Sequence, residues 1–341
     1  MGRSHRKGRN YETQGHAPLV AALDLGTNNC RLLVAQKKGS GYRIIDAFSR
    51  VIRLGEGLYS CGEINPAAMQ RARSAMAICA EKVRRHNVSV VRAVATEACR
   101  SATNGSHFVD SLASEFNVPL KIIDAREEML LAVRGCANLI RMDLDRTLLF
   151  DIGGGSTELV WIDPGRVASD GFDAAIIDWV SLPIGVVSLM DQFAPSGTAN
   201  EHMAQEMLSH CRMLMGPFLD RCQLDPLLLH TNRVHLLGTS GTVTTLTGMH
   251  LGLERYIRAR VDGTWIGANI LHRLTHEIFS MDNDARKMIP SVGSDRADLL
   301  VPGCAIIAAI VERFRGTRVR VADRGLREGM LQEIFTTMGN V

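Results

Sequence analysis

A short pattern that occurs twice places the strongest constraint on the fold of this chain. Residues 19–35 consist of an apolar run, the turn Asp24-Leu25-Gly26, and a second apolar run. Residues 148–162 repeat the same order around Asp151-Ile152-Gly153. Short apolar runs joined by glycine-containing turns are typical of paired β-strands. Because such a unit heads each half, the sequence predicts two related α/β halves that face each other across a cleft.

Each half continues with a third strand and then with alternating helices and strands. Strand patterns lie at 42–48, 88–95, 120–123, 176–182 and 234–237, and helical patterns lie at 66–85, 127–139 and 199–219, with further helices after Asn104 and from Thr242. At 341 residues the chain exceeds the usual size of a single hydrophobic core, which agrees with two domains.

The excess charge of the chain is concentrated at its N-terminus. The 39 Lys and Arg residues against 36 Asp and Glu residues give a net charge of +3. Five residues near the N-terminus account for all of it: Arg3, Arg6, Lys7 and Arg9 against Glu12. We therefore expect residues 1–17 to form a disordered basic tail, and we expect no folded basic face that would bind a specific nucleic acid.

The sequence predicts neither a membrane protein nor a disulfide framework. No run reaches the roughly 18 apolar residues of a membrane span, and the polar N-terminus lacks the apolar stretch of a secretory signal. The eight cysteines are scattered, without a Cys-x-x-Cys pair that would suggest a zinc site. We therefore expect a cytoplasmic protein with reduced and mostly buried thiols.

Three glycine-containing turns are candidate phosphate-binding loops. In Asp24–Asn29 and Asp151–Thr157, glycine lets the backbone approach a ligand closely, so that N–H groups can point at phosphate oxygens. Either turn alone could be a tight hairpin, but one at the head of each half favours a phosphate clamp. Gly238–Thr245 follows a strand and opens a helix, which makes it either a third anion site or a capped helix start. The candidate residues are Gly26, Thr27, Asn28, Gly153, Gly154, Gly155, Ser156, Thr157, Gly238, Thr239, Ser240 and Gly241.

Asp24 and Asp151 end their strands at the mouth of the expected cleft. Two carboxylates beside phosphate would repel it unless a cation lay between them, and Mg²⁺ bridges carboxylates to phosphate oxygens. Each aspartate could instead cap its own turn. The sequence contains no Walker loop, so arginines and a metal ion have to neutralise the phosphates. The expected cofactor is Mg²⁺ or another divalent cation.

Together these motifs resemble the exopolyphosphatase and guanosine pentaphosphate phosphohydrolase family, of the actin, sugar kinase and heat-shock protein superfamily. The resemblance covers residues 19–335 in the family's order, and the chain is similar to the short form. It implies two ribonuclease-H-like (actin-like ATPase) domains, 18–125 and 126–324, with the C-terminal helix 325–341 as a candidate to pack on the first. The segments that carry it are Ala21–Asn28, Ala93–Arg100, Asp151–Glu158, Gly238–Thr245, Arg296–Asp298 and Ala322–Gly329.

The resemblance implies a general base in the pair Glu127-Glu128. Family members activate water with a glutamate on the helix before the second phosphate loop, and Glu128 matches that position better than Glu127. Adjacent helix positions point about 100° apart, so only one of the two can face the cleft. Without the family, two acids that open a helix would be explained by the favourable helix dipole.

The resemblance implies three further roles. Glu158 matches an acid that helps hold metal or water. Arg31 and Arg100 match arginines that contact phosphate, with surface ion pairs as the alternative for both. Two positions depart from the family, because Asn29 and Glu97 stand where serine is more usual. These departures put only the side-chain contacts of the two positions in doubt.

The implied activity is Mg²⁺-dependent hydrolysis of a terminal phosphoanhydride, in inorganic polyphosphate or in guanosine pentaphosphate. Polyphosphate is favoured, because a long polyanion needs contacts beyond the cleft and the second half offers scattered basic side chains. They are Arg258, Arg260, Arg286, Lys287 and Arg296, with ordinary solvated surface as the alternative for Arg286 and Lys287. The rival from another class is an ATP-binding module, kinase-like or chaperone-like. The sequence leaves open whether the protein is a monomer or a homodimer.

Overall fold

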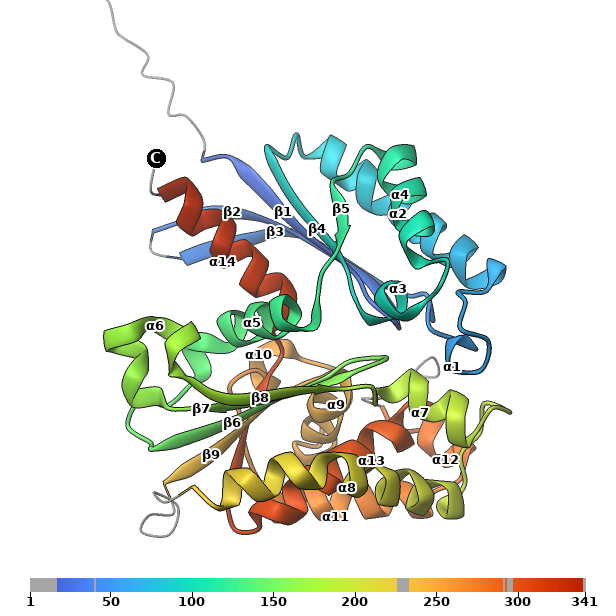
Figure 1. The fold of residues 1–341 in the computed structure, drawn as a ribbon, viewed down its shortest axis with the longest axis vertical. Helices are drawn as coiled ribbons and strands as arrows, with labels where there is room; N and C mark the ends of the chain where they lie inside the picture. The colour runs from blue at the N-terminus through green and yellow to red at the C-terminus, as the bar shows by residue number, and fades with distance from the viewer. Residues whose placement is uncertain (1–16, 40, 226–232, 291, 293–296, 340–341) are drawn as a thin grey trace, which may run out of the picture.

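The computed structural model describes residues 17–39, 41–225, 233–290, 292 and 297–339. They form two α/β halves, one above the other in Figure 1, each built on one mixed β-sheet. The predicted fold of two α/β halves is confirmed. The basic tail predicted for residues 1–17 lies outside the described residues except for its last position.

The upper half contains a five-stranded sheet in the order β3-β2-β1-β4-β5. Its strands are β1 (Leu19–Leu25), β2 (Asn29–Lys38), β3 (Gly41–Val51), β4 (Val90–Ala95) and β5 (Leu120–Ile122), and its helices are α1 (Leu58–Cys61), α2 (Pro66–Arg85), α3 (Glu97–Ser101) and α4 (Gly105–Phe116). Helix α2 begins where the Asn65 side chain accepts a hydrogen bond from the Ala68 amide at 2.8 Å. Its alanine-rich face then packs into the core of this half.

The lower half contains a six-stranded sheet in the order β10-β11-β9-β6-β7-β8. Its strands are β6 (Arg146–Ile152), β7 (Thr157–Ile162), β8 (Ile176–Leu182), β9 (Val234–Thr239), β10 (Trp265–Gly267) and β11 (Arg318–Ala322). Its helices are α6 (Val167–Ala175), α7 (Val186–Phe193), α8 (Glu201–Gln223), α9 (Gly241–His250), α10 (Arg258–Val261), α11 (Ala268–Ser280), α12 (Asn283–Lys287) and α13 (Leu300–Val311). Every residue of α13 is buried, as expected of a helix that is apolar all round.

The two sheets share one topology. In the upper sheet β1 pairs antiparallel with β2 and parallel with β4, and in the lower sheet β6 pairs antiparallel with β7 and parallel with β9. A third strand then pairs antiparallel with the second in each sheet, β3 with β2 and β8 with β7. The repeated strand–turn–strand pattern therefore marks a repeated architecture, and it brings the ends of β1 and β6 toward each other.

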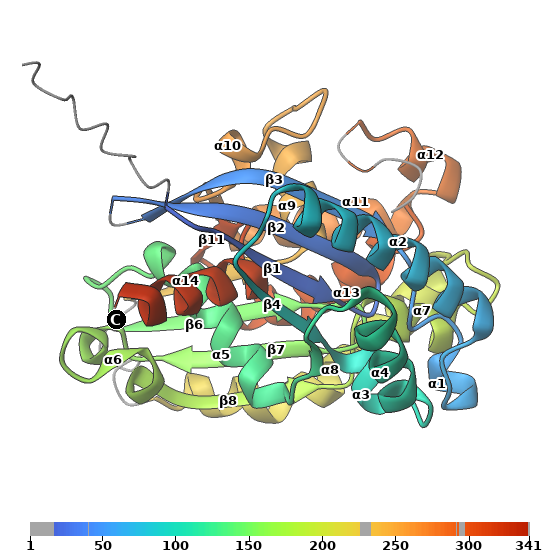
Figure 2. The same cartoon turned by 90° about the horizontal axis from the view of Figure 1, so that it is seen from above.

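Two helices connect the halves. Helix α5 (Ala125–Cys136) leads from the upper half to the lower, and α14 (Leu326–Gly339) leads back and packs beside β1 and β2 (Figure 1, Figure 2). The backbones of α5 and α14 are in close contact. A Cβ atom added at Gly135 would overlap the Gly325 carbonyl, and one added at Gly329 would overlap the Leu131 carbonyl. Only glycine permits so close an approach.

The observed elements differ from the expected ones mainly at their ends. Helix α5 begins at Ala125 rather than 127, because the Asp124 side chain accepts a hydrogen bond from the Glu127 amide at 2.7 Å. The domain boundaries at 125 and 324 and the cytoplasmic location stay predictions. All cysteines except Cys61 are buried, as expected. Within the described part of the chain, no helix is both long enough and apolar enough to cross a bilayer.

Candidate active site

A cavity of about 340 Å³ lies where the two halves meet. The β1–β2 turn, the β6–β7 turn, the start of α9 and the start of α14 all contribute to its lining. Among the predicted site residues, its lining includes Asp24, Gly26, Thr27, Asn28, Arg31, Asp151, Gly153, Gly154, Thr239, Ser240 and Gly241. The cavity therefore joins all three glycine-containing turns, although they are far apart in the sequence.

The two Asp-x-Gly turns have the same backbone geometry. The Gly26 amide donates a hydrogen bond to the Asn29 carbonyl at 2.9 Å, and the Gly153 amide donates one to the Ser156 carbonyl, also at 2.9 Å. The amides of residues 27–28 and 154–155 lie between the bonded residues and take no part in these turn hydrogen bonds. Such amides are suited to bind anions.

The turns also contact each other across the cleft. A Cβ atom added at Gly154 would lie 2.9 Å from Cβ of Thr27 and 3.0 Å from the Asn28 nitrogen. One added at Gly155 would lie 2.9 Å from Cγ of Glu97. The consecutive glycines are therefore needed for contact between the halves, and not only, as expected from the sequence, for the approach of a phosphate.

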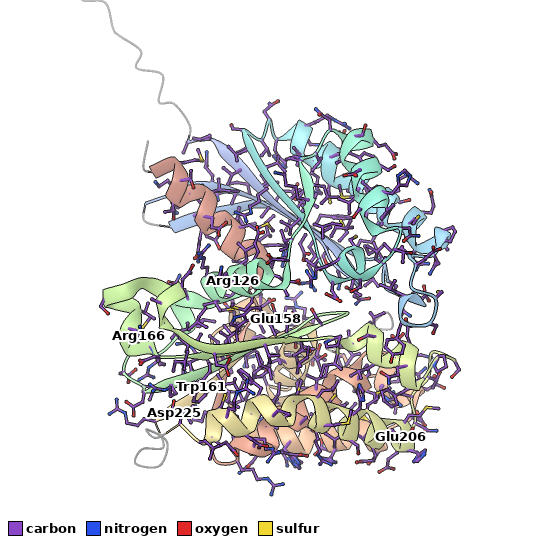
Figure 3. All side chains as sticks on the ribbon, in the orientation of Figure 1. Arg126, Glu158, Trp161, Arg166, Glu206 and Asp225 are labelled. Carbon is purple, nitrogen blue, oxygen red and sulfur yellow. The ribbon has the colours of Figure 1, made fainter. Side chains whose placement is uncertain are left out.

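The residues that pair with the two aspartates on the neighbouring strands differ in charge, because one is basic and the other is acidic. Asp24 pairs in register with Arg31 on β2, and Asp151 pairs with Glu158 on β7. Residues that face each other on neighbouring strands project to the same side of a sheet. Figure 3 labels Glu158 on the side of the lower sheet that faces α5 and the upper half. The upper half thus contributes a cation beside its aspartate, and the lower half contributes a second acid.

Burial and mutual repulsion raise the pKa values of these acids. Burial raises the pKa of Asp151 to about 7, with Glu128 adding to the effect. Burial, assisted by Asp151, raises the pKa of Glu158 to about 7. The pKa of Asp24 is also raised, by burial first, although Arg31 opposes the shift. Buried carboxylates that lie close to other carboxylates are stabilised either by taking up a proton or by a neighbouring cation.

Glu128 and Glu127 point to different environments. The Glu128 side chain is 15% exposed, and its Oε2 lies 3.1 Å from Nη1 of Arg100. Burial, followed by repulsion from Glu158, raises the pKa of Glu128 to about 8. The Glu127 side chain is 44% exposed and forms an ion pair of 2.6 Å with Arg92. Neither glutamate lines the cavity, but Glu128, unlike Glu127, is close enough to Asp24, Asp151 and Glu158 to affect their charges or be affected by them.

Arg100 lies between two carboxylates. Its guanidinium donates to Glu97 Oε2 at 3.0 Å through Nε and to Glu128 Oε2 at 3.1 Å through Nη1. It also donates to the Ile123 carbonyl at 2.7 Å. Arg100 therefore positions Glu128. It does not line the cavity, and its bonds to Glu97 and Glu128 give no support to the phosphate contact expected for it.

Arg31 and Arg327 are the guanidinium groups that line the cavity without a carboxylate partner in the described residues. No salt bridge within 4.0 Å joins either one to an acid there. Burial lowers the pKa of Arg327, with Glu328 and Asp24 opposing the shift. Arg327 was not among the predicted site residues, although it lies in the Ala322–Gly329 segment. A partly buried cation without a carboxylate partner beside a cavity is suited to bind an anion.

The third turn contributes its helix start rather than its first glycine. Gly238 lies within β9, where a Cβ atom would overlap the Phe150 ring. The Ser240 side chain caps α9 by accepting from the Val243 amide at 2.9 Å. Thr239, Ser240 and Gly241 line the cavity, so the N-terminal end of α9 faces it. Gly238 is thus a packing residue, contrary to our expectation of a phosphate contact.

Two other predicted residues are occupied by structural contacts. The Thr157 hydroxyl donates to the Ile184 carbonyl at 2.6 Å, so it is directed into the lower half. Ser156 is buried and hydrogen-bonds to Glu158. Neither residue belongs to the lining of the cavity. Their predicted phosphate contacts gain no support from this arrangement.

The expected track of basic side chains does not form around Arg286. This side chain is 1% exposed, and its Nη2 donates to the Ala199 carbonyl at 2.6 Å. Lys287 pairs with Asp284 at 2.9 Å, and Arg258 pairs with Glu328 at 3.0 Å. Arg296 lies outside the described residues. The prediction was wrong for Arg286, because sequence alone does not show which side of a short helix is buried.

The oxygen atoms around the cavity fit a hard divalent cation. The side-chain oxygens Oδ1 of Asn28 and Asn29 are buried and have no hydrogen-bond partner in the described structure. Both residues line the cavity beside Asp24 and Asp151. No three of the cleft carboxylates within the described ranges converge to 4.8 Å. Mg²⁺ suits this arrangement, since it keeps several waters and takes few protein ligands.

Comparisons with known proteins point to one family. The model of the Ppx/GppA phosphatase family matches residues 33–338. A provisionally named exopolyphosphatase of Haemophilus influenzae is 27% identical over 323 residues, which cover 94% of this chain and 93% of that protein. A guanosine-5'-triphosphate,3'-diphosphate pyrophosphatase of Vibrio parahaemolyticus is also 27% identical, but this chain spans only 60% of its length.

The fold agrees with solved structures. The crystal structure of an exopolyphosphatase from Cytophaga hutchinsonii superposes with a TM-score of 0.80 at 23% identity, over 94% of this chain and 98% of that one. The Aquifex aeolicus member of the Ppx/GppA family superposes with a TM-score of 0.72 at 24% identity, over 94% and 98% of the two chains. Both similarities establish the architecture described above.

Proposed function

This chain belongs to the Ppx/GppA phosphatase family and is a hydrolase, and from that premise we propose that it removes the terminal phosphoryl group of inorganic polyphosphate as orthophosphate. The observation that carries the proposal is the cavity between the halves. Buried acids and guanidinium groups without partners meet there in the described structure. Phosphoryl transfer requires positioning and charge neutralisation above all, and these groups supply both.

Each group has a distinct task in the proposed reaction. The amides of the two Asp-x-Gly turns and the start of α9 hold the last phosphates, and Arg31 and Arg327 neutralise their charge. Glu128 takes the proton from the attacking water, and Arg100 keeps its carboxylate in place. Glu158 lies beside Asp151 in register and orients water through its buried carboxylate.

Asp24 and Asp151 would hold Mg²⁺, with the orphan oxygens of Asn28 and Asn29 nearby. When bound, the ion supplies positive charge to the phosphate oxygens. Its second effect falls on the protein itself. A cation beside the acids favours their ionised forms, so Glu128 becomes available as a base near neutral pH.

The coverage of the relatives supports polyphosphate as the first substrate to test. This chain matches nearly the whole length of a relative named as an exopolyphosphatase, and only 60% of a relative named for guanosine pentaphosphate. The test measures orthophosphate release from polyphosphate, guanosine pentaphosphate and ATP, at several Mg²⁺ concentrations and without an acceptor. We expect the highest kcat/KM for polyphosphate. Release from ATP alone would favour the ATP-binding module instead.

One aromatic residue favours guanosine pentaphosphate as the second candidate. Tyr256 is 41% exposed, lines the cavity, and donates a hydrogen bond from its hydroxyl to Asp323 at 2.6 Å. A fixed ring is suited to stack on a nucleobase, whereas polyphosphate has none. If the nucleotide is a substrate, Tyr256→Ala should lower kcat/KM for guanosine pentaphosphate by about tenfold. The same variant should hydrolyse polyphosphate as well as the original protein does.

A further inference from the structure

A group of metal-binding residues lies in the lower half, outside the cavity and unrelated to the phosphohydrolase proposal. His272 and His276 are one turn apart on α11, and Glu312 opens the 3₁₀ turn Glu312–Phe314 that follows α13. One ligand atom from each of the three lies within 4.8 Å of the others. The imidazole centroids are 4.6 Å apart. All three side chains are partly exposed, so an ion could reach them from solvent.

The spacing of the donors fits a tetrahedral ion. Nε2 of His272 lies 3.4 Å from Oε1 of Glu312. Two donors at about 2.1 Å from a tetrahedral Zn²⁺ are separated by about 3.4 Å. His272 and Glu312 are therefore already at the separation that such an ion requires. His276, at i+4 on the same helix face, is placed to supply the third donor.

A basic side chain on a neighbouring helix holds the carboxylate ligand of this group in place. Arg212 on α8 donates to both carboxylate oxygens of Glu312, at 2.9 and 2.8 Å. A carboxylate oxygen has two lone pairs, so Oε1 can accept from Arg212 and still bind an ion. Hydrogen-bonded partners of this kind orient ligating carboxylates in metal sites.

We propose that His272, His276 and Glu312 form a site for a divalent first-row transition metal such as Zn²⁺. Two imidazoles and one carboxylate suit Zn²⁺, Ni²⁺ or Cu²⁺, whereas Mg²⁺ prefers oxygen ligands only. Three protein ligands leave a fourth position for water. The ion would join α11 to the end of α13 and, through Arg212, to α8. The alternative is a His272–Glu312 ion pair that binds no metal.

The chain contains a matched control for this site. His202 and Glu206 also lie at i and i+4 on a helix, with Nε2 and Oε1 3.6 Å apart, and His202 is 83% exposed. They supply two donors rather than three. His202→Gln should therefore leave metal binding unchanged, while His276→Gln removes a ligand. Cys61 is exposed and could bind Zn²⁺ by itself, so both variants are made in a Cys61→Ser background.

The experiment is a calorimetric titration of ZnCl₂ into the full, untagged chain, stripped with EDTA and dialysed into buffer with excess Mg²⁺. We expect one Zn²⁺ per chain, with Kd at least about tenfold weaker in His276→Gln and unchanged in His202→Gln. Zinc-edge X-ray absorption should show only nitrogen and oxygen ligands at about 2.0–2.1 Å, and no sulfur at about 2.3 Å. Circular dichroism in EDTA checks that the variants are folded.

Three outcomes would overturn the site. They are no binding of Zn²⁺ to the folded background protein, an unchanged Kd in folded His276→Gln, and an absorption spectrum that shows sulfur. If the His276→Gln protein does not fold, Glu312→Gln replaces it. This change keeps the size of the side chain and one of the two hydrogen bonds from Arg212. The same expectations then apply to that variant. Because the test follows metal binding, it does not depend on the activity of the cavity.

Discussion

Replacing Glu128 by Gln should separate catalysis from binding. The change keeps the size of a side chain that is 15% exposed but removes the carboxylate that faces the other cleft acids. Loss of a positioned general base costs about 10²–10⁴-fold in kcat, which corresponds to about 3–5 kcal/mol of barrier. The groups proposed to hold phosphate are untouched, so the Kd for polyphosphate should stay within about threefold.

Glu127→Gln is the matched control, one residue away on the same helix. Its carboxylate is 44% exposed and pairs with Arg92, outside the cavity, so its loss should cost about 0.2–1 kcal/mol of stability at most. We expect kcat within about threefold of the original. The assay is orthophosphate release at saturating polyphosphate, with binding followed by calorimetry. A large loss in Glu127→Gln together with normal turnover in Glu128→Gln would show that the general base is misassigned.

The charges around the cavity lead to three further predictions. Arg100→Gln should move the rising limb of the pH–rate profile to higher pH, because Arg100 lowers the pKa of Glu128 and the base has to be ionised; an unmoved limb would mean that Glu128 does not titrate in the profile. Arg327→Gln should lower kcat/KM about 10–100-fold by removing a charge-assisted contact, whereas the exposed Arg260→Gln should have little effect; equal effects would count against the phosphate role. Without metal, the protein should lose stability as pH rises from about 5 to 8, because Asp151, Glu158 and Glu128 have folded-state pKa values of about 7, 7 and 8 and hold protons that the unfolded chain has already released. Mg²⁺ should restore the Tm mainly at pH 8, and a Tm in EDTA that increases over this range would contradict the argument.

The repeated turns can be predicted because their chemistry is local. An apolar run followed by Asp-x-Gly defines the strand end, the turn and the facing residue, so the amino-acid pattern alone is enough to place both aspartates at the cleft. The choice between Glu127 and Glu128 depends on resemblance to a family. Which of two adjacent helix residues faces inward is decided by how α5 packs between the sheets.

Burial of charged residues cannot be predicted in the same way. Arg286 is buried and donates to backbone carbonyls in the lower half, whereas Arg327 is partly exposed and lines the cavity. Nothing in their neighbouring residues distinguishes them. The sequence also does not reveal why glycines are needed at 154 and 155, because the reason is their contact with a turn more than a hundred residues away.

The close contact of α5 and α14 has a mechanical consequence. With no side chain between Gly135 and the Gly325 carbonyl, or between Gly329 and the Leu131 carbonyl, the helices cannot slide past each other without a clash. We expect any rotation of one half against the other to turn about this contact. The 2.7 Å ion pair of Arg53 with Asp298, which joins the halves elsewhere, would then have to break. Because Glu128 lies on α5 itself, close to the axis of such a rotation, it would move least.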